Sequence, residues 1–190
     1  TQMEINYVDK FSLLTSERLS HKNIVASEKL QISLQSIQSI FSINKFNGKN
    51  NKFNAIFKNA FSFDSPSIST FNINDNQLAL WVRSNSFFII SDESKLNDLV
   101  SVFESNASIT DQTGGWVIFN IEGKACRSLF EKLLTVDLEG FDKGKVIRTS
   151  IAGINCFTLC KSKFDQYNIL CPISFYESMT SRLESLIKLI

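Results

Sequence analysis

The chain has 190 residues, of which 43% are hydrophobic and 21% charged, with 20 Lys and Arg residues against 19 Asp and Glu residues. This length and composition predict a globular domain, and a net charge of +1 gives no bulk attraction to nucleic acid or to an anionic membrane. No apolar run approaches the roughly 20 residues of a membrane span, and residues 1–10 lack the apolar centre of a signal peptide. We therefore expect a soluble, cytoplasmic protein.

The first 29 residues mix charged and apolar positions without a regular period. We expect residues 1–29 to form an N-terminal arm, because segments of this kind are ordered only when something holds them. Residues 30–190 then form the folded domain.

The first part of this domain alternates between strand and helix patterns. Leu30, Ile32 and Leu34 alternate with polar residues, as in a half-buried strand, and an extended pattern continues over residues 37–43. Asn47 and Gly48 predict a turn after this extended segment. We predict a helix over 53–61, strands at 71–73, 78–83 and 86–91, and a helix over 96–103 capped by Ser91 or Asp92.

The second part follows the same order. After Gly114 and Gly115 we predict a strand at 116–121, a turn at Gly123, a helix over 125–134, a hairpin of strands 146–151 and 154–160 about Ala152 and Gly153, and a strand at 166–171. Ser174 and Glu177 match a capping box, which predicts a last helix with Met179, Leu183 and Ile190 on its inner side.

Both parts therefore follow the order β-α-β-β-β-α. The match lies in the pattern and not in residue identity, and it indicates an internal duplication with halves at 30–108 and 109–190. Each half has a sheet face that its helices can cover, so the predicted fold class is α+β with duplicated halves.

The cysteines form no C-x-x-C pair, and three of the four fall in predicted strands: Cys126, Cys156, Cys160 and Cys171. We interpret them as buried thiols in a reducing compartment. The 17 Phe residues leave two explanations open, a compositional drift away from Leu or a surface that faces a partner.

The sequence contains no constellation that catalysis requires. His21 is the only histidine and lies in the arm, whereas a triad needs a fixed imidazole and a zinc site needs ligands at set spacing. Gly114 and Gly115 lack the pattern of a phosphate loop. The carboxylates near strand ends, which are not spaced as an acid–base pair, are Asp111, Glu122, Asp137, Glu139 and Asp142. We assign no catalytic, cofactor-binding or metal-binding residue.

Basic residues gather near the predicted hairpin, which is the one place where nucleic acid could be considered. They are Lys143, Lys145, Arg148, Lys161 and Lys163, and their acidic neighbours are Asp137, Glu139, Asp142 and Asp165. Because these charges offset one another, we expect no nucleic-acid binding.

Residues 78–190 carry short motifs that occur in one order. They are 78–82 followed by 87–90; the strand 116–121 followed by Gly123, Ala125 and Arg127; Asp137 and Leu138 followed by Phe141, Gly144 and Thr149; and 172–175 before the last helix. In this order and spacing the chain resembles the gamma subunit of heterotetrameric sarcosine oxidase. It departs from that family at residues 131–135, where the family often has Lys-Gly-Cys.

The resemblance implies a fold like the folate-binding domain of aminomethyltransferases, built from duplicated β-α-β-β-β-α halves. It implies a non-catalytic subunit within a complex that oxidatively demethylates sarcosine to glycine, with H2O2 as product and transfer of one carbon to tetrahydrofolate. Aminomethyltransferases carry paired aspartates after a glycine turn near their folate site. Here Gly153 is followed by Ile154, Asn155 and Cys156, so no folate role carries over.

The resemblance also implies partners and cofactors. The partners would be the alpha, beta and delta subunits, mainly alpha, and the cofactors FAD, FMN, NAD, tetrahydrofolate and zinc would lie on those subunits. The alternative is a stand-alone protein that binds folate or resembles aminomethyltransferases.

Overall fold

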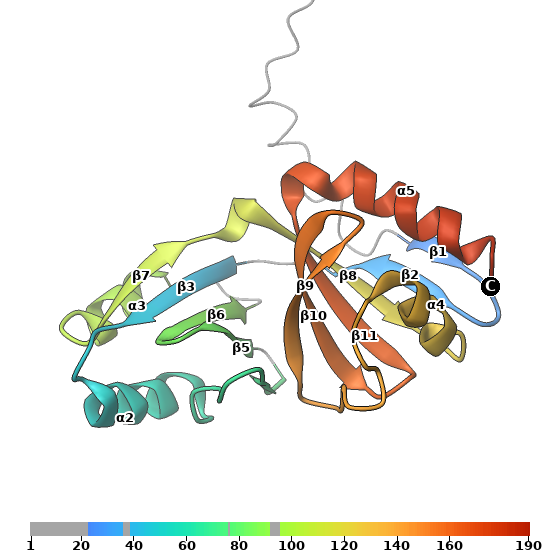
Figure 1. Cartoon of the computed structure of the whole chain (residues 1–190). Coiled ribbons are helices and arrows are strands. Elements are labelled where there is room, and N and C mark those ends of the chain that lie inside the picture. Colours follow the sequence, from blue (N-terminus) through green and yellow to red (C-terminus); the bar gives the residue numbers. More distant parts are fainter. Residues whose placement is uncertain (1–22, 36–38, 76, 92–95) are drawn as a thin grey trace, which may run out of the picture.

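The computed structural model describes residues 23–35, 39–75, 77–91 and 96–190. Most of the expected arm, with His21, lies outside the described residues. The described chain forms four layers, in which two antiparallel sheets pack on each other and helices cover the outer face of each (Figure 1). Among the described residues, no helix has both the length and the apolar character needed to cross a bilayer.

The six-stranded sheet has helices α4 (Cys126–Leu133) and α5 (Tyr176–Ile187) on its outer face. Its strands, in spatial order, are β1 (Asn23–Ala26), β2 (Gln31–Leu34), β8 (Trp116–Glu122), β11 (Gln166–Pro172), β10 (Ile154–Ser162) and β9 (Val146–Ile151). Alternate residues of β8 and β11 face the two helices, so Phe119, Tyr167 and Ile169 are buried under them.

The five-stranded sheet carries helices α2 (Asn50–Phe61) and α3 (Leu96–Phe103) on its outer face. Its strands, in spatial order, are β4 (Phe71–Ile73), β5 (Gln77–Arg83), β6 (Ser86–Ser91), β3 (Ser39–Lys45) and β7 (Ala107–Asp111). Phenylalanines dominate this core, since Phe53, Phe57, Phe61 and Phe103 are all at most 1% exposed. Part of the unusual Phe content is therefore structural.

The two sheets meet through their inner faces. Phe88 of β6 packs edge-on against Trp116 of β8 and Phe157 of β10, with ring centroids 5.4 and 5.8 Å apart. The sheets are also joined at their edges by a bridge between Thr70 and Lys145. The inner core therefore holds the two sheets in one body.

Two sets of elements have the same arrangement. The chain order β3-α2-β4-β5-β6-α3 is repeated as β8-α4-β9-β10-β11-α5, and the sheet order β4-β5-β6-β3 is repeated as β9-β10-β11-β8. Where β4 and β9 meet, each set donates one backbone hydrogen bond to the other. Phe71 N donates to Gly144 O (3.0 Å), and Val146 N donates to Ser69 O (2.9 Å). Equivalent positions in the two sets can therefore be compared directly.

Most of the predicted elements are confirmed, but one predicted strand joins the other sheet and one observed strand was not predicted. Residues 31–34 were expected in the first half, but β2 pairs with β8 in the six-stranded sheet. Ile32 and Leu34 belong to the core under α4 and α5. The apolar face of this strand is therefore buried by the helices of the six-stranded half. Residues 107–111 form β7, which pairs with β3. The boundary between 30–108 and 109–190 stays a prediction.

Three local predictions are wrong. Residues 23–26, expected in an irregular arm, form β1 and pair with β2. The capping box at Ser174 and Glu177 is absent, because Ser174 lies in a 3-10 turn and α5 is preceded by Phe175 without a side-chain cap. Ile190, expected on the inner side, lies beyond α5 and is 36% exposed. The predicted cap Asp92 lies outside the described residues, and Ser91 ends β6.

Candidate functional site

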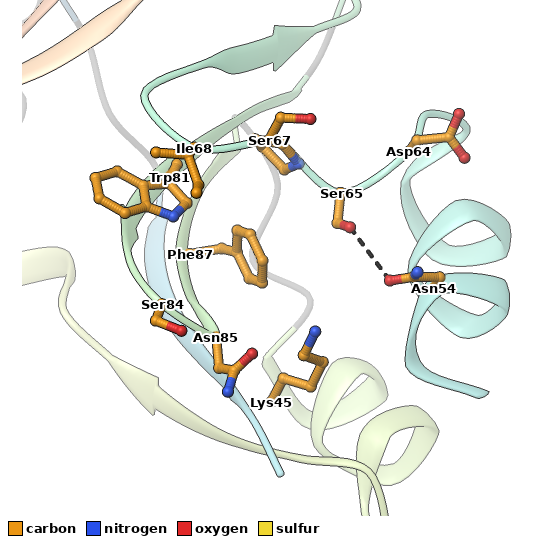
Figure 2. A pocket seen from close by; sticks show the side chains of 11 residues that line it. Lys45, Asn54, Asp64, Ser65, Ser67, Ile68, Trp81, Ser84, Asn85 and Phe87 are labelled. Carbon is orange, nitrogen blue, oxygen red and sulfur yellow. Dashed lines mark hydrogen bonds between the residues drawn. The ribbon is translucent and has the colours of Figure 1, made fainter. Parts of the chain in front are cut away.

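An open cleft lies on the five-stranded half, between the chain that follows α2 and the hairpin of β5 and β6. Its volume is about 500 Å³, which falls within the range of small-ligand pockets. Figure 2 shows Phe87 between Trp81 on one side and Ser65 with Asn54 on the other, with Lys45 directed toward the same space. We refer to this feature as the Trp81 cleft.

The floor of the Trp81 cleft is aromatic because β5 and β6 bring large side chains together at one register position. Trp81 pairs with Phe87 across the two strands, and both rings belong to the outer core of this sheet. Phe87 lies 5.8 Å from Phe53 and 5.8 Å from Phe57, measured between ring centroids. The contacts with Phe53 and Phe57 therefore hold the Phe87 ring in place.

The rim of the cleft is polar. Ser65 Oγ lies 3.3 Å from Asn54 Oδ1 and donates to it, which ties the loop to α2 (Figure 2). Asn85, in the left-handed conformation at the tip of the hairpin (φ 59°), donates to Asn47 Oδ1 at 3.2 Å. Both contacts hold connecting segments of the backbone in place.

Two charged groups reach the cleft. The Lys45 ammonium lies 5.5 Å from the centroid of the Phe53 ring, a cation–π geometry. The Asp64 carboxylate is 3.2 Å from Lys58 on the exposed side of α2, so its charge is already matched. The cleft therefore offers aromatic surface, amide and hydroxyl groups and one positive charge, which suits binding.

A second hollow of about 390 Å³ adjoins the Trp81 cleft and shares Asp64, Ser65 and Ser67 with it. Its far wall comes from Lys143 and Lys145, at the junction of the two sheets. The loop after α2 thus separates two hollows, each of which is lined by lysine.

The four cysteines are buried free thiols, as predicted. Burial raises the pKa of the Cys126 thiol to about 12, and the carboxylates of Asp165 and Glu122 add to this effect. Its Sγ also donates to Asp165 O at 3.2 Å. Burial likewise raises the pKa of the Cys160 thiol, whereas a hydrogen bond with Cys171 lowers that of Cys156.

We predict that the protein loses stability as the pH rises from about 9 toward about 12. Burial raises the pKa of Cys126 and of Tyr167 to about 12, so the unfolded chain releases these protons at lower pH than the folded chain does. The midpoint of urea unfolding should therefore be lower at about pH 10.5 than at about pH 8. This difference between the two midpoints should be smaller in Cys126→Ala. A midpoint that rises with pH would contradict this assignment.

Some of the charged residues singled out in the sequence form surface ion pairs or turn hydrogen bonds. Lys163 lies 2.8 Å from Asp142 and lowers the pKa of that carboxyl, and Arg127 lies 2.8 Å from Glu139. Asp111 and Asp137 accept backbone N–H bonds at 2.8 and 2.9 Å. None of these groups lines the Trp81 cleft.

The remaining residues considered as candidates are also accounted for. Gly114 and Gly115 belong to a 3-10 turn that leads into β8, as their interpretation as a turn predicts. Among the described residues, no three His, Cys, Asp or Glu side chains gather as a metal site would require. The Trp81 cleft itself was not predicted, although Asp64, Ser65, Pro66 and Ser67 between Phe63 and Ile68 were a signal for a loop there.

No protein-family model matches the sequence, and no curated protein matches it. The fold nevertheless belongs to a known class, since it is the α+β fold of aminomethyltransferase-like proteins. A chain of the heterotetrameric sarcosine oxidase from Corynebacterium sp. U-96, solved with pyrrole 2-carboxylate, superposes with a TM-score of 0.73 at 19% identity. The likeness covers 84% of this chain and 84% of that one.

A second solved structure shares the fold over a smaller part. It is the glycine cleavage system aminomethyltransferase T from Bartonella henselae, with a TM-score of 0.57 and 10% identity. The likeness covers 76% of this chain and 42% of that chain, so the present sequence matches less than half of the aminomethyltransferase. Both structures confirm the aminomethyltransferase-like fold that the motifs of residues 78–190 implied, whereas the duplication of its halves stays a prediction.

Proposed function

We propose that this chain is a non-catalytic subunit of the gamma type in a heterotetrameric sarcosine oxidase. The observation that carries the proposal is the extent of the likeness, which covers 84% of both chains. The same fold covers only 42% of the aminomethyltransferase. A chain that matches a component of a multi-subunit enzyme along most of its length is best explained as such a component.

The described residues fit this role. The thiols are buried, Asp142 and Lys163 form a surface pair, and Asp111 and Asp137 accept hydrogen bonds in turns. The Trp81 cleft supplies groups for binding but no imidazole, thiol or carboxylate pair. In this proposal the chain contributes interface area to the complex, typically well above a thousand Å² in permanent assemblies.

The proposed complex oxidatively demethylates sarcosine to glycine in the cytoplasm, produces H2O2 and passes one carbon to tetrahydrofolate when that is present. The alpha, beta and delta subunits are the proposed partners, with alpha as the main one. FAD, FMN, NAD, tetrahydrofolate and zinc would be held by those subunits.

We further propose that the two halves arose by internal duplication. The repeated element order and sheet order support this, as do the reciprocal hydrogen bonds at the junction. The main-chain contact from Trp81 N to Thr70 O (3.1 Å) also has a counterpart from Cys160 N to Lys145 O (3.0 Å).

A stand-alone folate-binding protein is the alternative, and one position argues against it. Gly153 forms a tight turn with Ala152, both at positive φ, and leads into β10. The next residues are Ile154, Asn155 and Cys156, so the paired aspartates expected for a folate site are missing there. Titration of the isolated chain with tetrahydrofolate should show no saturable binding; binding at micromolar concentration would favour the alternative.

Removal of this chain from the cell tests the proposal directly. Extracts of cells that lack it should lose sarcosine-dependent H2O2 production and regain it when the chain is expressed again. The purified chain alone should produce none. If extracts without the chain keep full activity, the proposed role is wrong.

A further inference from the structure

Two of the buried cysteines lie opposite each other on neighbouring strands. Phe157 of β10 pairs with Leu170 of β11 in an antiparallel register. Cys156 directly precedes the first of these residues and Cys171 directly follows the second, so the two cysteines face each other across the strands. Both side chains belong to the core under α4 and α5, and both are 0% exposed. They are therefore direct neighbours on one face of the sheet.

At this position the backbone of β10 forms its hydrogen bonds on the side away from β11. Cys160 N donates to Lys145 O at 3.0 Å, and Gly144 N donates to Cys160 O at 2.9 Å, so Cys160 bonds toward β9. The bonding side alternates along a strand, and no register shift separates Cys156 from Cys160, so both residues bond toward β9. The pair of Cys156 and Cys171 is therefore of the non-hydrogen-bonded type, in which the Cα atoms lie about 4.5 Å apart and the side chains are closest.

This spacing meets the requirement of a disulfide bond, whose Cα atoms usually lie about 4.4–6.8 Å apart. A hydrogen bond between the two thiols lowers the pKa of Cys156. The same bond, together with burial, raises the pKa of Cys171. Cys156 is therefore the thiol that more readily becomes a thiolate, which is the reactive form of cysteine.

The other two cysteines have different neighbours. Cys160 lies opposite Tyr167 across the same two strands. Cys126 of α4 donates to Asp165 O at 3.2 Å. Burial raises the pKa of both thiols. These two cysteines are therefore controls, within the same core, for what the pairing of Cys156 with Cys171 contributes.

We propose that Cys156 and Cys171 form a reversible disulfide when the chain meets hydrogen peroxide. The Cys156 thiolate attacks one peroxide oxygen and the O–O bond breaks, which leaves a sulfenic acid and a hydroxide that takes up the proton released by Cys156. The Cys171 sulfur then attacks the sulfenic sulfur, and the hydroxide that leaves takes up the Cys171 proton. Two thiols and one peroxide thus give one disulfide and two waters, because each sulfur loses one electron and each peroxide oxygen gains one.

Oxidation requires an opening of the cover over the two sulfurs. The chain leaves β11 directly after Cys171 and enters α5 through the 3-10 turn Ile173–Phe175. α5 starts without a side-chain cap, and its Met179 and Leu183 side chains lie in the same core as the two cysteines (Figure 1). Because a terminal helix can open without global unfolding, the disulfide should form slowly in water and faster in urea below the unfolding midpoint.

A count of thiols in the full chain tests the proposal. The reduced chain is treated with hydrogen peroxide at about 1 mM, the peroxide is removed with catalase, and the chain is unfolded in urea and alkylated with iodoacetamide. The untreated chain should take up four alkyl groups, one for each free cysteine. The treated chain should take up two fewer and regain them after reduction with dithiothreitol. Tandem mass spectrometry of the wild type should find the linkage of Cys156 to Cys171 at least about tenfold more often than any other, since this pair has disulfide spacing.

Variants of the full chain locate the reaction. Cys160→Ala is the matched control, because it removes a buried thiol from the same strand, and it should still lose two thiols on treatment. Cys156→Ala and Cys171→Ala should form no intramolecular disulfide. The oxidised wild type should unfold at a urea concentration about 0.5 M or more above that of the reduced chain, because the bond restricts the unfolded chain.

Three outcomes would overturn the proposal. They are a treated chain that keeps all four thiols, a dominant linkage between other cysteines or between two chains, and a urea midpoint of the oxidised chain that is no higher than that of the reduced chain. In the proposed complex, sarcosine oxidation would supply the peroxide, but the test adds peroxide directly. Failure of the disulfide therefore leaves the proposed function intact, and a chain that belongs to no such complex can still form the disulfide.

Discussion

Phe57→Ala should lower the free energy of unfolding by about 3–5 kcal/mol, the cost of a large cavity in a packed core. Phe57 is fully buried, and its ring lies within 6.4 Å, between centroids, of five other phenylalanine rings. The loss is expected to be large because Phe57 lies at the centre of the three buried phenylalanines of α2, and domains of this size have only about 5–15 kcal/mol of stability.

Urea denaturation of the wild type and the variant measures this difference. Val102→Ala, on the exposed side of α3 with 50% exposure, is the matched control and should cost less than about 1 kcal/mol. A Phe57→Ala loss as small as that of the control would show that the phenylalanine cluster does not hold α2 and the floor of the Trp81 cleft in place.

Gly123→Ala should destabilise the protein by roughly 3 kcal/mol through backbone strain and overpacking together. Gly123 has a φ of +127°, and a Cβ there would lie 2.4 Å from Lys29 O and 3.0 Å from Leu30 Cα. The close approach lets Ala125 N donate to Lys29 O at 3.1 Å, which holds the chain at the start of β2. A side chain at this position pushes β2 away from β8.

Gly48→Ala is the control for backbone strain alone, because its φ is +76° and no atom lies within 4 Å of the added Cβ. It should cost about 1 kcal/mol. Hydrogen exchange in Gly123→Ala should accelerate most at the β2 amides. If the two variants lost the same free energy of unfolding, the contact of the added Cβ with Lys29 would not contribute to the destabilisation of Gly123→Ala.

The sequence predicts the local elements well because each sheet has a clear apolar face. Alternation at 31–34, helical spacing at 53–61 and the hairpin about Ala152 and Gly153 all appear where expected. Which sheet a strand joins is a tertiary property. The period of β2 shows only that one face is buried, and its pairing with β8 depends on Gly123, whose close contact with Lys29 no local pattern reveals.

The candidate site was harder to predict than the fold. Its residues come from β3, α2, the loop after α2 and the hairpin of β5 and β6, so no single motif contains it. Trp81 and Phe87 were expected as strand residues with two apolar faces, which their positions confirm.

Native mass spectrometry of the tagged chain, purified from the cells that make it, tests the central claim most directly. The account predicts that this chain is recovered in equal stoichiometry with larger subunits, at least one of which carries flavin, and that the assembly oxidises sarcosine. Recovery of this chain as a folded monomer that does not associate with such subunits would contradict it.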